Sequence, residues 1–216
     1  SGMLGSTMFF DLANSHDVGG TVRDGACKKF FPEHLVKKII SDVDVLDPKQ
    51  LEQILKTVQP QVVINCIGVI KQVTGTEDPL ITLPVNSIFP HKLARTCSLL
   101  GIRVIHISTD CVFSGEKGRY LETDISDARD LYGKSKFLGE LNDYANCVTL
   151  RTSIIGHGIV ANKSLIDWFL AQNGTVQGYT RAIYNGLPTN ELVRIVNEFV
   201  LPNDALRGLY HVSSKP

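Results

Sequence analysis

Short runs of apolar residues alternate along this chain with longer stretches in which apolar residues recur every three or four positions. The runs within residues 61–72, 102–110 and 147–156 are typical of strands buried on both faces of a parallel sheet. Residues 47–58 and 84–101 have helical spacing instead. Parallel neighbouring strands need a crossover connection, and that connection is normally right-handed. The alternation therefore predicts an α/β fold built on a doubly wound parallel sheet.

Local signals set the expected ends of these elements. Asp47 can cap the helix after it, with Pro48 in the first turn and Gln50 at the third position, much like a capping box. Gly101 is expected to close the second helix, and the first apolar run is expected to end at Gly68. The faces turned toward the sheet are expected to carry the apolar residues at helical spacing, namely Leu51, Ile54, Leu55, Val58, Leu93, Ala94, Cys97 and Leu100.

The expected elements outside this central part are less regular. At the start, Gly2 and Gly5 precede a helix with apolar Leu4, Met8, Phe9 and Leu12, and strands are expected within residues 16–25 and 39–48. The helix that begins near residue 131 is expected to run to about Tyr144. Beyond Ser153 the pattern changes to a helix around residues 164–174, a short strand around 175–180, the segment 185–201 and a last strand at 208–214.

Composition excludes several classes of partner. Lysine plus arginine and aspartate plus glutamate number 22 each, so the formal net charge is zero, which argues against nucleic acid and anionic membrane as partners. Apolar runs stay well short of the roughly 18 residues of a membrane span. Five cysteines without CxxC spacing are interpreted as mostly small buried hydrophobes in a reducing, cytoplasmic compartment. Six scattered histidines form no paired ligand set, so no catalytic metal is expected.

Tyr132 and Lys136 are the strongest candidates for chemistry. Four residues apart on a helix, their side chains lie on one face, and a nearby ammonium is expected to lower the phenol pKa. Most such pairs on surface helices are only solvated, so the spacing alone is weak evidence. The preceding strand adds weight because it ends at Ser108 and Thr109, and a hydroxyl at a strand end can converge with the Tyr/Lys pair on one carbonyl oxygen.

A second candidate site is the start of the chain. Gly2 and Gly5 before a helix match the second half of a dinucleotide-binding fingerprint, in which a pyrophosphate sits on the helix N-terminus. Arg23 follows the next expected strand, where an arginine accommodates a 2′-phosphate and an acidic residue selects NAD. Arg23 favours NADP(H). A solvated surface arginine is the alternative, and Asp24 serves NAD(H) if the strand ends one residue later.

The order of four motifs carries a resemblance to a known family. STDCVFSG at residues 108–115, ETD at 122–124, YGKSK at 132–136 and LRTS at 150–153 resemble the extended short-chain dehydrogenase/reductase superfamily. Within it, the likeness is to the dTDP-4-dehydrorhamnose reductase family, in one register over the whole chain. The resemblance implies an NAD(P)-binding Rossmann domain over residues 1–152. It also implies a substrate-binding part over residues 153–216, with segments of the two interleaved.

The resemblance also implies the members of a site. Thr109, Tyr132 and Lys136 are expected to be catalytic. The residues expected to contact the cofactor are Gly2, Met3, Leu4, Gly5, Arg23, Asp44, Val45, Cys66, Gly68 and Lys136. Those expected to contact a nucleotide-sugar substrate are Val69, Lys71, Asp110, Arg151, Thr152 and Thr189. Structural turn chemistry explains Asp44 equally well, and Asn86 is expected to be structural.

The implied activity is hydride transfer from NADPH to a ketone at C4 of a nucleotide-linked 6-deoxyhexose, in the synthesis of deoxysugars for cell-surface polysaccharide. Thr109 is expected to hydrogen-bond the carbonyl oxygen, Tyr132 to protonate it, and Lys136 to hold the nicotinamide ribose and lower the tyrosine pKa. A homodimer is left open. Family members have a strand before residue 1 and further residues after 216, so the chain is expected to lack both.

Two other functions fit the same motifs. A nucleotide-sugar epimerase or dehydratase shares the fold and the Tyr/Lys pair. Dehydratases of this superfamily usually add acidic residues beside the threonine, whereas Asp110 is followed here by Cys111. A regulatory subunit of methionine adenosyltransferase, which binds NADP without an established sugar substrate, belongs to the same family and is the non-catalytic alternative.

Overall fold

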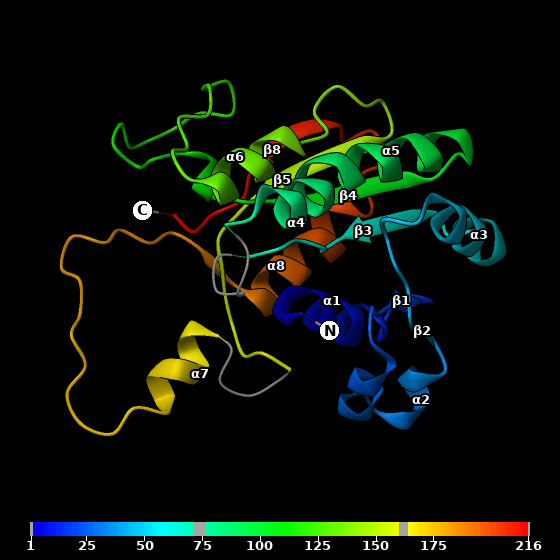
Figure 1. Cartoon of the computed structure of the whole chain (residues 1–216), viewed down its shortest axis with the longest axis horizontal. Coiled ribbons are helices and arrows are strands. Elements are labelled where there is room, and N and C mark those ends of the chain that lie inside the picture. Colours follow the sequence, from blue (N-terminus) through cyan, green and yellow to red (C-terminus); the bar gives the residue numbers. More distant parts are fainter. Residues whose placement is uncertain (1, 71–76, 160–163, 216) are drawn as a thin grey trace. The chain divides into compact units, whose positions relative to one another are not determined.

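The computed structural model describes residues 2–70, 77–159 and 164–215, and the chain in it forms two compact units (Figure 1). Residues 44–152 and 205–212 form one, called here the sheet unit. Residues 1–43, 153–204 and 213–216 form the other, called here the N-terminal unit. Which of the two binds a cofactor and which a substrate stays a prediction, because compactness alone does not show what a unit binds.

The sheet unit is built on four parallel strands in the order β3-β4-β5-β8. Their bounds are Val62–Asn65, Arg103–Ser108, Cys147–Arg151 and Gly208–His211. The register pairs Ile105 of β4 with Ile64 of β3 on one side and with Val148 of β5 on the other. Every residue of β4 and β5 is buried, as their apolar runs predicted.

Helices in the sheet unit are α3 (Pro48–Val58), α4 (Pro79–Leu83), α5 (Phe89–Leu99) and α6 (Leu131–Leu138). A π-helical segment, Pro84–Ile88, joins α4 to α5. Helix α5 packs on β4 and contacts α3, and α6 packs on the π-helical segment (Figure 1). The core of this unit lies between these helices and the sheet, with Leu51, Leu55, Phe89, Leu93, Cys97, Val104 and Leu141 among its members.

The predicted helix ends in this unit are largely confirmed. The Asp47 carboxylate accepts hydrogen bonds from the backbone N–H of Lys49 and of Gln50, so it caps α3. Gly101 has φ +70°, and the N–H groups of Gly101 and Ile102 donate to the carbonyls of Ser98 and Cys97. This is the left-handed closure that glycine permits without strain after a helix.

Three expectations in this unit are wrong. Val58 is 46% exposed because it stands in the last turn of α3, beyond the core contact of Leu55. Helix α6 ends at Leu138 rather than near Tyr144, since the chain turns at Gly139 where a side chain would collide with the Asn86 carbonyl. Strand β3 ends at Asn65, whose side chain accepts the Ile67 N–H and bends the chain away before Gly68.

The N-terminal unit contains the helices α1 (Met3–Leu12), α2 (Glu33–Val36), α7 (Leu165–Leu170) and α8 (Thr189–Ile195). A second π-helical segment, Val196–Val200, continues α8. Its strands are short parallel pairs: β1 (Gly20–Thr21) with β2 (Ile39–Ile40), and β6 (Ile154–Ile155) with β7 (Leu187–Pro188). Helix α1 packs against α8, and Phe9, Val22, Phe31, Leu35 and Ile39 form a second core.

Several N-terminal and C-terminal expectations also need correction. Gly5 lies inside the first turn of α1 and not before it, so Gly2 alone precedes the helix. Residues 175–180 form no strand, because they lack a neighbouring ladder among the described residues. Strand β8 pairs with β5 and belongs to the sheet unit, whereas its expected place in a substrate-binding part interleaved with the first domain stays a prediction. Over the described residues, no helix is both long enough and apolar enough to cross a membrane.

Candidate active site

Thr109 follows directly after β4, at the carboxyl end of a fully buried strand. It begins a 3₁₀ turn over Asp110–Val112, and its hydroxyl oxygen accepts the Cys111 N–H at 3.2 Å. The same hydroxyl donates to an oxygen of Asp110 at 3.3 Å. Only 6% of Thr109 is exposed, so the local turn fixes its side chain in a nearly dry position.

Helix α6 brings Tyr132 to this turn. Its N-terminus is capped by Asp130, whose carboxylate accepts the Gly133 N–H at 2.7 Å. Gly133 allows a close approach, because a Cβ there would lie 2.7 Å from the Ala128 Cβ and closer still to the Cys111 carbonyl oxygen. Tyr132 is hydrogen-bonded to the Thr109 side chain. The Thr109 and Tyr132 side chains are therefore neighbours in the sheet unit, and their convergence with Lys136 on one carbonyl oxygen stays a prediction.

Lys136 lies one turn further along α6 and is buried. Its ammonium donates a hydrogen bond to the Ile107 carbonyl at 2.8 Å, near the end of β4. Burial lowers the pKa of Lys136 to about 8, while electrostatic interactions with Glu140 and, to a smaller extent, with Cys66 act to raise that pKa. At neutral pH the side chain is mostly charged.

The expected effect of Lys136 on Tyr132 is not found. The pKa of Tyr132 is raised to about 12, first by burial and then by the charges of Cys111, Asp110 and Asp130, while a hydrogen bond with the Thr109 side chain acts to lower it. Burial is the largest of these causes, and the Lys136 ammonium donates to the Ile107 carbonyl. Tyr132 therefore keeps its proton throughout the neutral range.

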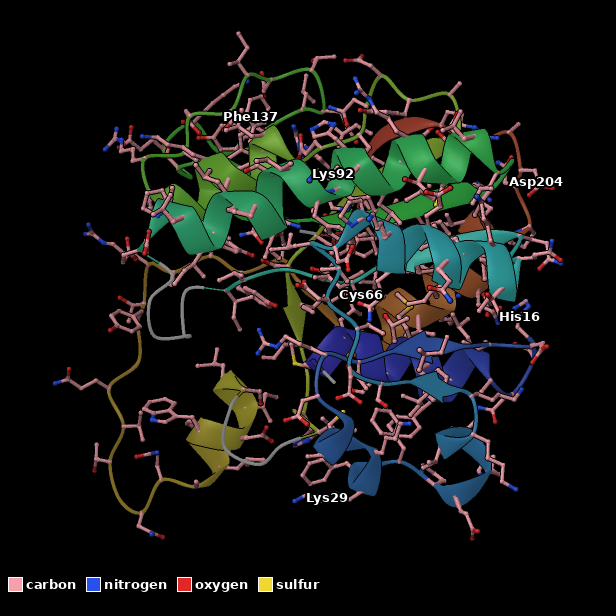
Figure 2. All side chains as sticks on the ribbon, turned by 45° about the vertical axis from the view of Figure 1, so that its right-hand side comes forward. His16, Lys29, Cys66, Lys92, Phe137 and Asp204 are labelled. Carbon is pink, nitrogen blue, oxygen red and sulfur yellow. The ribbon has the colours of Figure 1, made fainter. Side chains whose placement is uncertain are left out.

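The segment after β3 holds three further predicted residues. Cys66 follows β3 (Figure 2), and burial raises the pKa of its thiol to about 12, so it is not a reactive thiolate. The Asn86 amide binds both backbone groups of Val69, accepting its N–H at 2.8 Å and donating to its carbonyl at 3.0 Å. Gly68 is exposed beside Asn86. Asn86 is thus structural, as expected, and Lys71 lies outside the described residues.

Arg151, predicted to contact substrate, has structural partners at the end of β5. Its guanidinium forms a bidentate pair with Glu140, with both N–O distances at 2.7 Å, and stacks on the Phe113 ring. The side chains of Arg151 and Glu140 are 3% and 2% exposed. Thr152, the next residue, is buried as well. Contact of either residue with a substrate stays a prediction.

Asp44 and Val45 begin the sheet unit. The Asp44 carboxylate accepts the Leu46 N–H at 2.9 Å, and its own N–H donates to the Gln50 side chain at 2.6 Å. Val45 packs against the core of the unit. Turn and cap chemistry therefore accounts for Asp44, and a contact of either residue with adenine stays a prediction.

The remaining predicted residues lie in the N-terminal unit. Gly2 precedes α1, Met3 and Leu4 are in its first turn, and no side chain caps its N-terminus. Arg23 is exposed just after β1, while Asp24 caps the next 3₁₀ turn by accepting the Ala26 N–H at 2.8 Å. Thr189 is buried as the first residue of α8. Asp24 therefore has a structural role as the cap of this turn, and its contact with the ribose of NAD(H) stays a prediction.

Sequence reasoning missed the buried polar residues around Lys136. Glu140 binds Arg151 and also accepts a hydrogen bond from the Ser108 hydroxyl at 2.8 Å. His106, within β4, faces Asn65 at 3.1 Å, and burial lowers its pKa well below the ordinary value, so it is neutral. The one available signal was the position of Glu140, four residues after Lys136.

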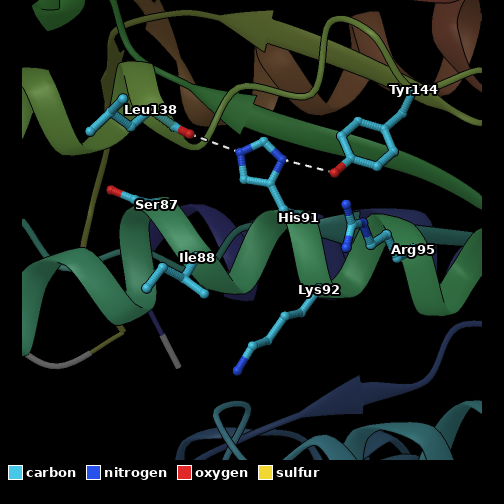
Figure 3. A pocket seen from close by; sticks show the side chains of 7 residues that line it. All are labelled: Ser87, Ile88, His91, Lys92, Arg95, Leu138 and Tyr144. Atoms are coloured by element: carbon cyan, nitrogen blue, oxygen red, sulfur yellow. Dashed lines mark hydrogen bonds between the residues drawn. The ribbon is translucent and has the colours of Figure 1, made fainter.

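A hollow of about 510 Å³ lies elsewhere in the sheet unit (Figure 3). Its lining comes from the π-helical segment, α5, the end of α6 and Tyr144. Figure 3 shows His91 between the Tyr144 hydroxyl, at 3.0 Å, and the Leu138 carbonyl, at 2.8 Å. Lys92 and Arg95 lie on the same stretch of α5. None of the predicted site residues lines this hollow.

Comparison with known proteins identifies relatives over most of the chain. The model of the family described as RmlD substrate binding domain matches residues 1–215. A dTDP-4-dehydrorhamnose reductase of Mycobacterium tuberculosis is 35% identical over 127 residues, which are 55% of this chain and 41% of that protein. The beta subunit of mouse methionine adenosyltransferase 2 is 28% identical over 142 residues, 65% of this chain and 39% of that protein. This chain thus spans less than half of either relative.

A solved structure shows the same fold. The dTDP-4-dehydrorhamnose reductase of Bacillus anthracis, crystallised in complex with NADP, superposes with a TM-score of 0.73 at 21% identity, covering 94% of this chain and 77% of that one. At this identity the likeness establishes the parallel α/β, Rossmann-like fold.

Proposed function

This chain belongs to the family described as the RmlD substrate binding domain, and on that premise we propose that it is an NADPH-dependent reductase of a nucleotide-linked 4-keto-6-deoxyhexose. The observation that carries the proposal is the hydrogen bond between Tyr132 and Thr109, at the carboxyl end of β4, with Lys136 one turn along α6. Ligands of open parallel sheets bind beyond the carboxyl ends of the strands.

Residues of the N-terminal unit fit the phosphate groups of a dinucleotide cofactor. In the N-terminal unit, the first turn of α1 contains no acidic residue and its N-terminus has no side-chain cap, which suits a pyrophosphate. A Cβ at Gly2 would meet nothing within 4 Å, so the backbone there is open to a ligand. Arg23 is exposed and forms no ion pair among the described residues, which leaves its guanidinium available to a 2′-phosphate.

Chemistry of the reaction divides between cofactor and chain. NADPH, when bound, supplies the hydride that reduces the ketone carbon. Tyr132, whose pKa of about 12 keeps it protonated, donates its proton to the oxygen as general acid, a role worth typically a hundred- to ten-thousand-fold in rate. Thr109 donates a hydrogen bond to that oxygen, and Lys136 holds hydroxyls of the nicotinamide ribose. One hydride and one proton convert the ketone to an alcohol.

The substrate would be a dTDP- or UDP-linked sugar, and the reaction would take place in the cytoplasm. Its product would be a deoxysugar that is used to make cell-surface polysaccharide. Among the residues proposed to contact the substrate, Asp110 is the one that directly follows Thr109 in the chain. Val69, Arg151, Thr152 and Thr189 complete the proposed contacts whose residues are described.

The test is NADPH oxidation with a panel of dTDP- and UDP-linked 4-keto-6-deoxyhexoses. Tyr132→Phe should keep cofactor binding and lose at least about a hundredfold in turnover, because it lacks the transferable proton. Tyr179→Phe removes the same hydroxyl at a tyrosine that is 88% exposed, and it should turn over like the wild type. Equal turnover by Tyr132→Phe and Tyr179→Phe would end the assignment of Tyr132.

Arg23 sets the cofactor preference in this proposal. Arg23→Ala should weaken NADPH binding at least about tenfold and leave NADH binding nearly unchanged, because only NADPH carries the 2′-phosphate. Arg181→Ala, at another exposed arginine of the same unit, serves as control and should change neither. An equal loss for both cofactors in Arg23→Ala would show that Arg23 does not read the phosphate.

The likeness to the mouse methionine adenosyltransferase subunit supports a second candidate, a non-catalytic NADP-binding regulatory subunit. Binding of NADP without NADPH consumption across the whole panel favours it. Conversion of the sugar without net NADPH consumption favours an epimerase or dehydratase.

A further inference from the structure

Lys136 is surrounded by few groups that can compensate its charge. Among the described residues its ammonium donates one hydrogen bond, to the Ile107 carbonyl at 2.8 Å, and the residue is 5% exposed. The titratable groups that influence it are Glu140, after α6, and Cys66, after β3, and Lys136 in turn acts on His106 of β4. His106 is neutral and Cys66 stays protonated, so Glu140 carries the negative charge among these groups.

Glu140 is held firmly by its own partners. Oε1 accepts the Arg151 Nε–H at 2.7 Å and the Ser108 hydroxyl at 2.8 Å, and Oε2 accepts an N–H of Arg151 Nη2 at 2.7 Å. Ser108 is the last residue of β4 and directly follows Ile107, the acceptor for Lys136. One strand end therefore anchors both the ammonium and the carboxylate.

We infer that Glu140 is a positioning residue for Lys136, whose carboxylate, fixed by Ser108 and Arg151, keeps the buried ammonium charged at the end of β4. The inference rests on the proposed function, in which Lys136 holds the cofactor ribose. A purely structural Glu140–Arg151 pair would also stabilise the unit, but it would leave the titration of Lys136 unchanged.

The geometry explains why one carboxylate matters here. Arg151 and Lys136 are both cations, and the charge of Glu140 is shared between them. Coulomb interactions are strong where water is excluded, so the buried ammonium would lose a favourable interaction if the carboxylate were removed. Its charged form would then be disfavoured further, and a larger fraction of the amine would be neutral at neutral pH.

The experiment is a titration of Lys136 itself, independent of activity. In protein labelled with carbon-13 at lysine, the Lys136 side-chain NMR signal is assigned by its loss in Lys136→Met and followed against pH. The wild type should titrate near pH 8. Glu140→Gln, which keeps an acceptor for Ser108, should lower the midpoint by at least about one pH unit, a tenfold change in the acid constant.

Two further variants keep the test decisive. Glu140→Gln leaves Arg151 unpaired and can impair folding, so Glu140→Gln/Arg151→Met removes both charges together, a replacement that folded proteins often tolerate. It should also lower the midpoint, but by less than Glu140→Gln does, because removing the Arg151 cation acts in the opposite direction. Glu191→Gln, in the exposed pair with Arg194, is the matched control and should leave the midpoint unchanged. An unchanged midpoint in the folded Glu140 variants would overturn the inference.

NADPH binding followed against pH on the same samples separates the two proposals. Loss of binding at alkaline pH should move to lower pH in the Glu140 variants, in step with the NMR midpoint. If the wild type neither binds nor oxidises NADPH, the proposed function fails, while the NMR midpoints still decide the role of Glu140. A shifted midpoint with an unshifted binding profile would overturn the link from Glu140 to the cofactor.

Discussion

Gly133 lies between the two proposed catalytic residues of α6, and its replacement by alanine tests how the site is assembled. The new methyl group would lie 2.7 Å from the Ala128 Cβ and closer still to the Cys111 carbonyl oxygen. Neither neighbour is the free end of a flexible side chain, so the backbone must move. Such overpacking typically costs about 1–3 kcal/mol. Alanine regains about 1 kcal/mol of helix propensity over glycine, so we expect a net loss of about 0–2 kcal/mol.

The functional effect should exceed the stability effect. To relieve the collision, α6 must move away from the 3₁₀ turn at residues 110–112. This movement would separate Tyr132, on α6, from Thr109, at the start of the turn. A displacement of about 1 Å at reacting groups can cost about a hundredfold in rate. Gly133→Ala should therefore remain folded in urea titrations at moderate loss of stability while its NADPH turnover falls at least about tenfold.

The matched control is Gly178→Ala, because a Cβ at Gly178 meets nothing within 4 Å and its φ is not in the left-handed region. We expect it to change the free energy of unfolding by less than about 0.5 kcal/mol and to leave turnover intact. Wild-type stability and turnover in Gly133→Ala would show that α6 does not approach the turn as closely as described, and would refute the reasoning.

Three further predictions concern stability, each measured by urea unfolding. Asp47→Ala should cost about 1 kcal/mol, because two N–H groups of the first turn of α3 lose their cap; an unchanged midpoint would contradict the capping role. Asn86→Ala should lower the free energy of unfolding by about 3 kcal/mol, because it removes the hydrogen bonds of the amide to both backbone groups of Val69 and to Ser135. A decrease below about 1 kcal/mol would mean that water replaces the amide. Burial lowers the pKa of Lys136 to about 8 in the folded chain, so above that pH the unfolded chain binds more protons than the folded chain does. The free energy of unfolding should therefore rise between about pH 8 and pH 10, and it should rise more in the wild type than in Lys136→Met.

The parts of the fold that the sequence predicted well are those decided by local chemistry. Strands β4 and β5 were recognisable because nearly continuous apolar runs have no other stable place in an alternating α/β chain. Asp47 and Gly101 marked helix ends because capping and left-handed closure depend on one residue and its immediate neighbours.

The expectations that were wrong depend on contacts between residues that are far apart in the sequence. The end of α6 depends on the close approach of Gly139 to Asn86, more than fifty positions earlier, which no local pattern in residues 131–144 reveals. The exposure of Val58 likewise depends on where the core beneath α3 stops. The strand expected at residues 175–180 had only local β propensity in its favour, and such propensity is weak without a neighbouring ladder.

The candidate site shows the same division. The placement of Tyr132 and Lys136 on one helix and of Thr109 at a strand end was predictable from spacing, because a helical repeat and a strand end fix their direction, while their catalytic roles stay predictions. The expected electrostatics were wrong, because spacing does not show that a carbonyl at the end of β4 captures the ammonium. Burial then governs the phenol and holds its pKa near 12.

The charges beneath this site oppose stability and favour binding of a ligand. Two buried cations, Arg151 and Lys136, share the carboxylate of Glu140, and the lowered pKa of Lys136 shows that its charged form is disfavoured in the folded chain. An ion pair of Arg151 and Glu140 alone would be neutral, so the excess positive charge in this cluster comes from Lys136. The excess cation lies at the carboxyl end of a parallel strand, where ribose hydroxyls can provide the hydrogen bonds that the protein does not. Bound cofactor should therefore raise the pKa of Lys136, and the carbon-13 titration repeated with saturating NADP would show it as a midpoint above pH 8.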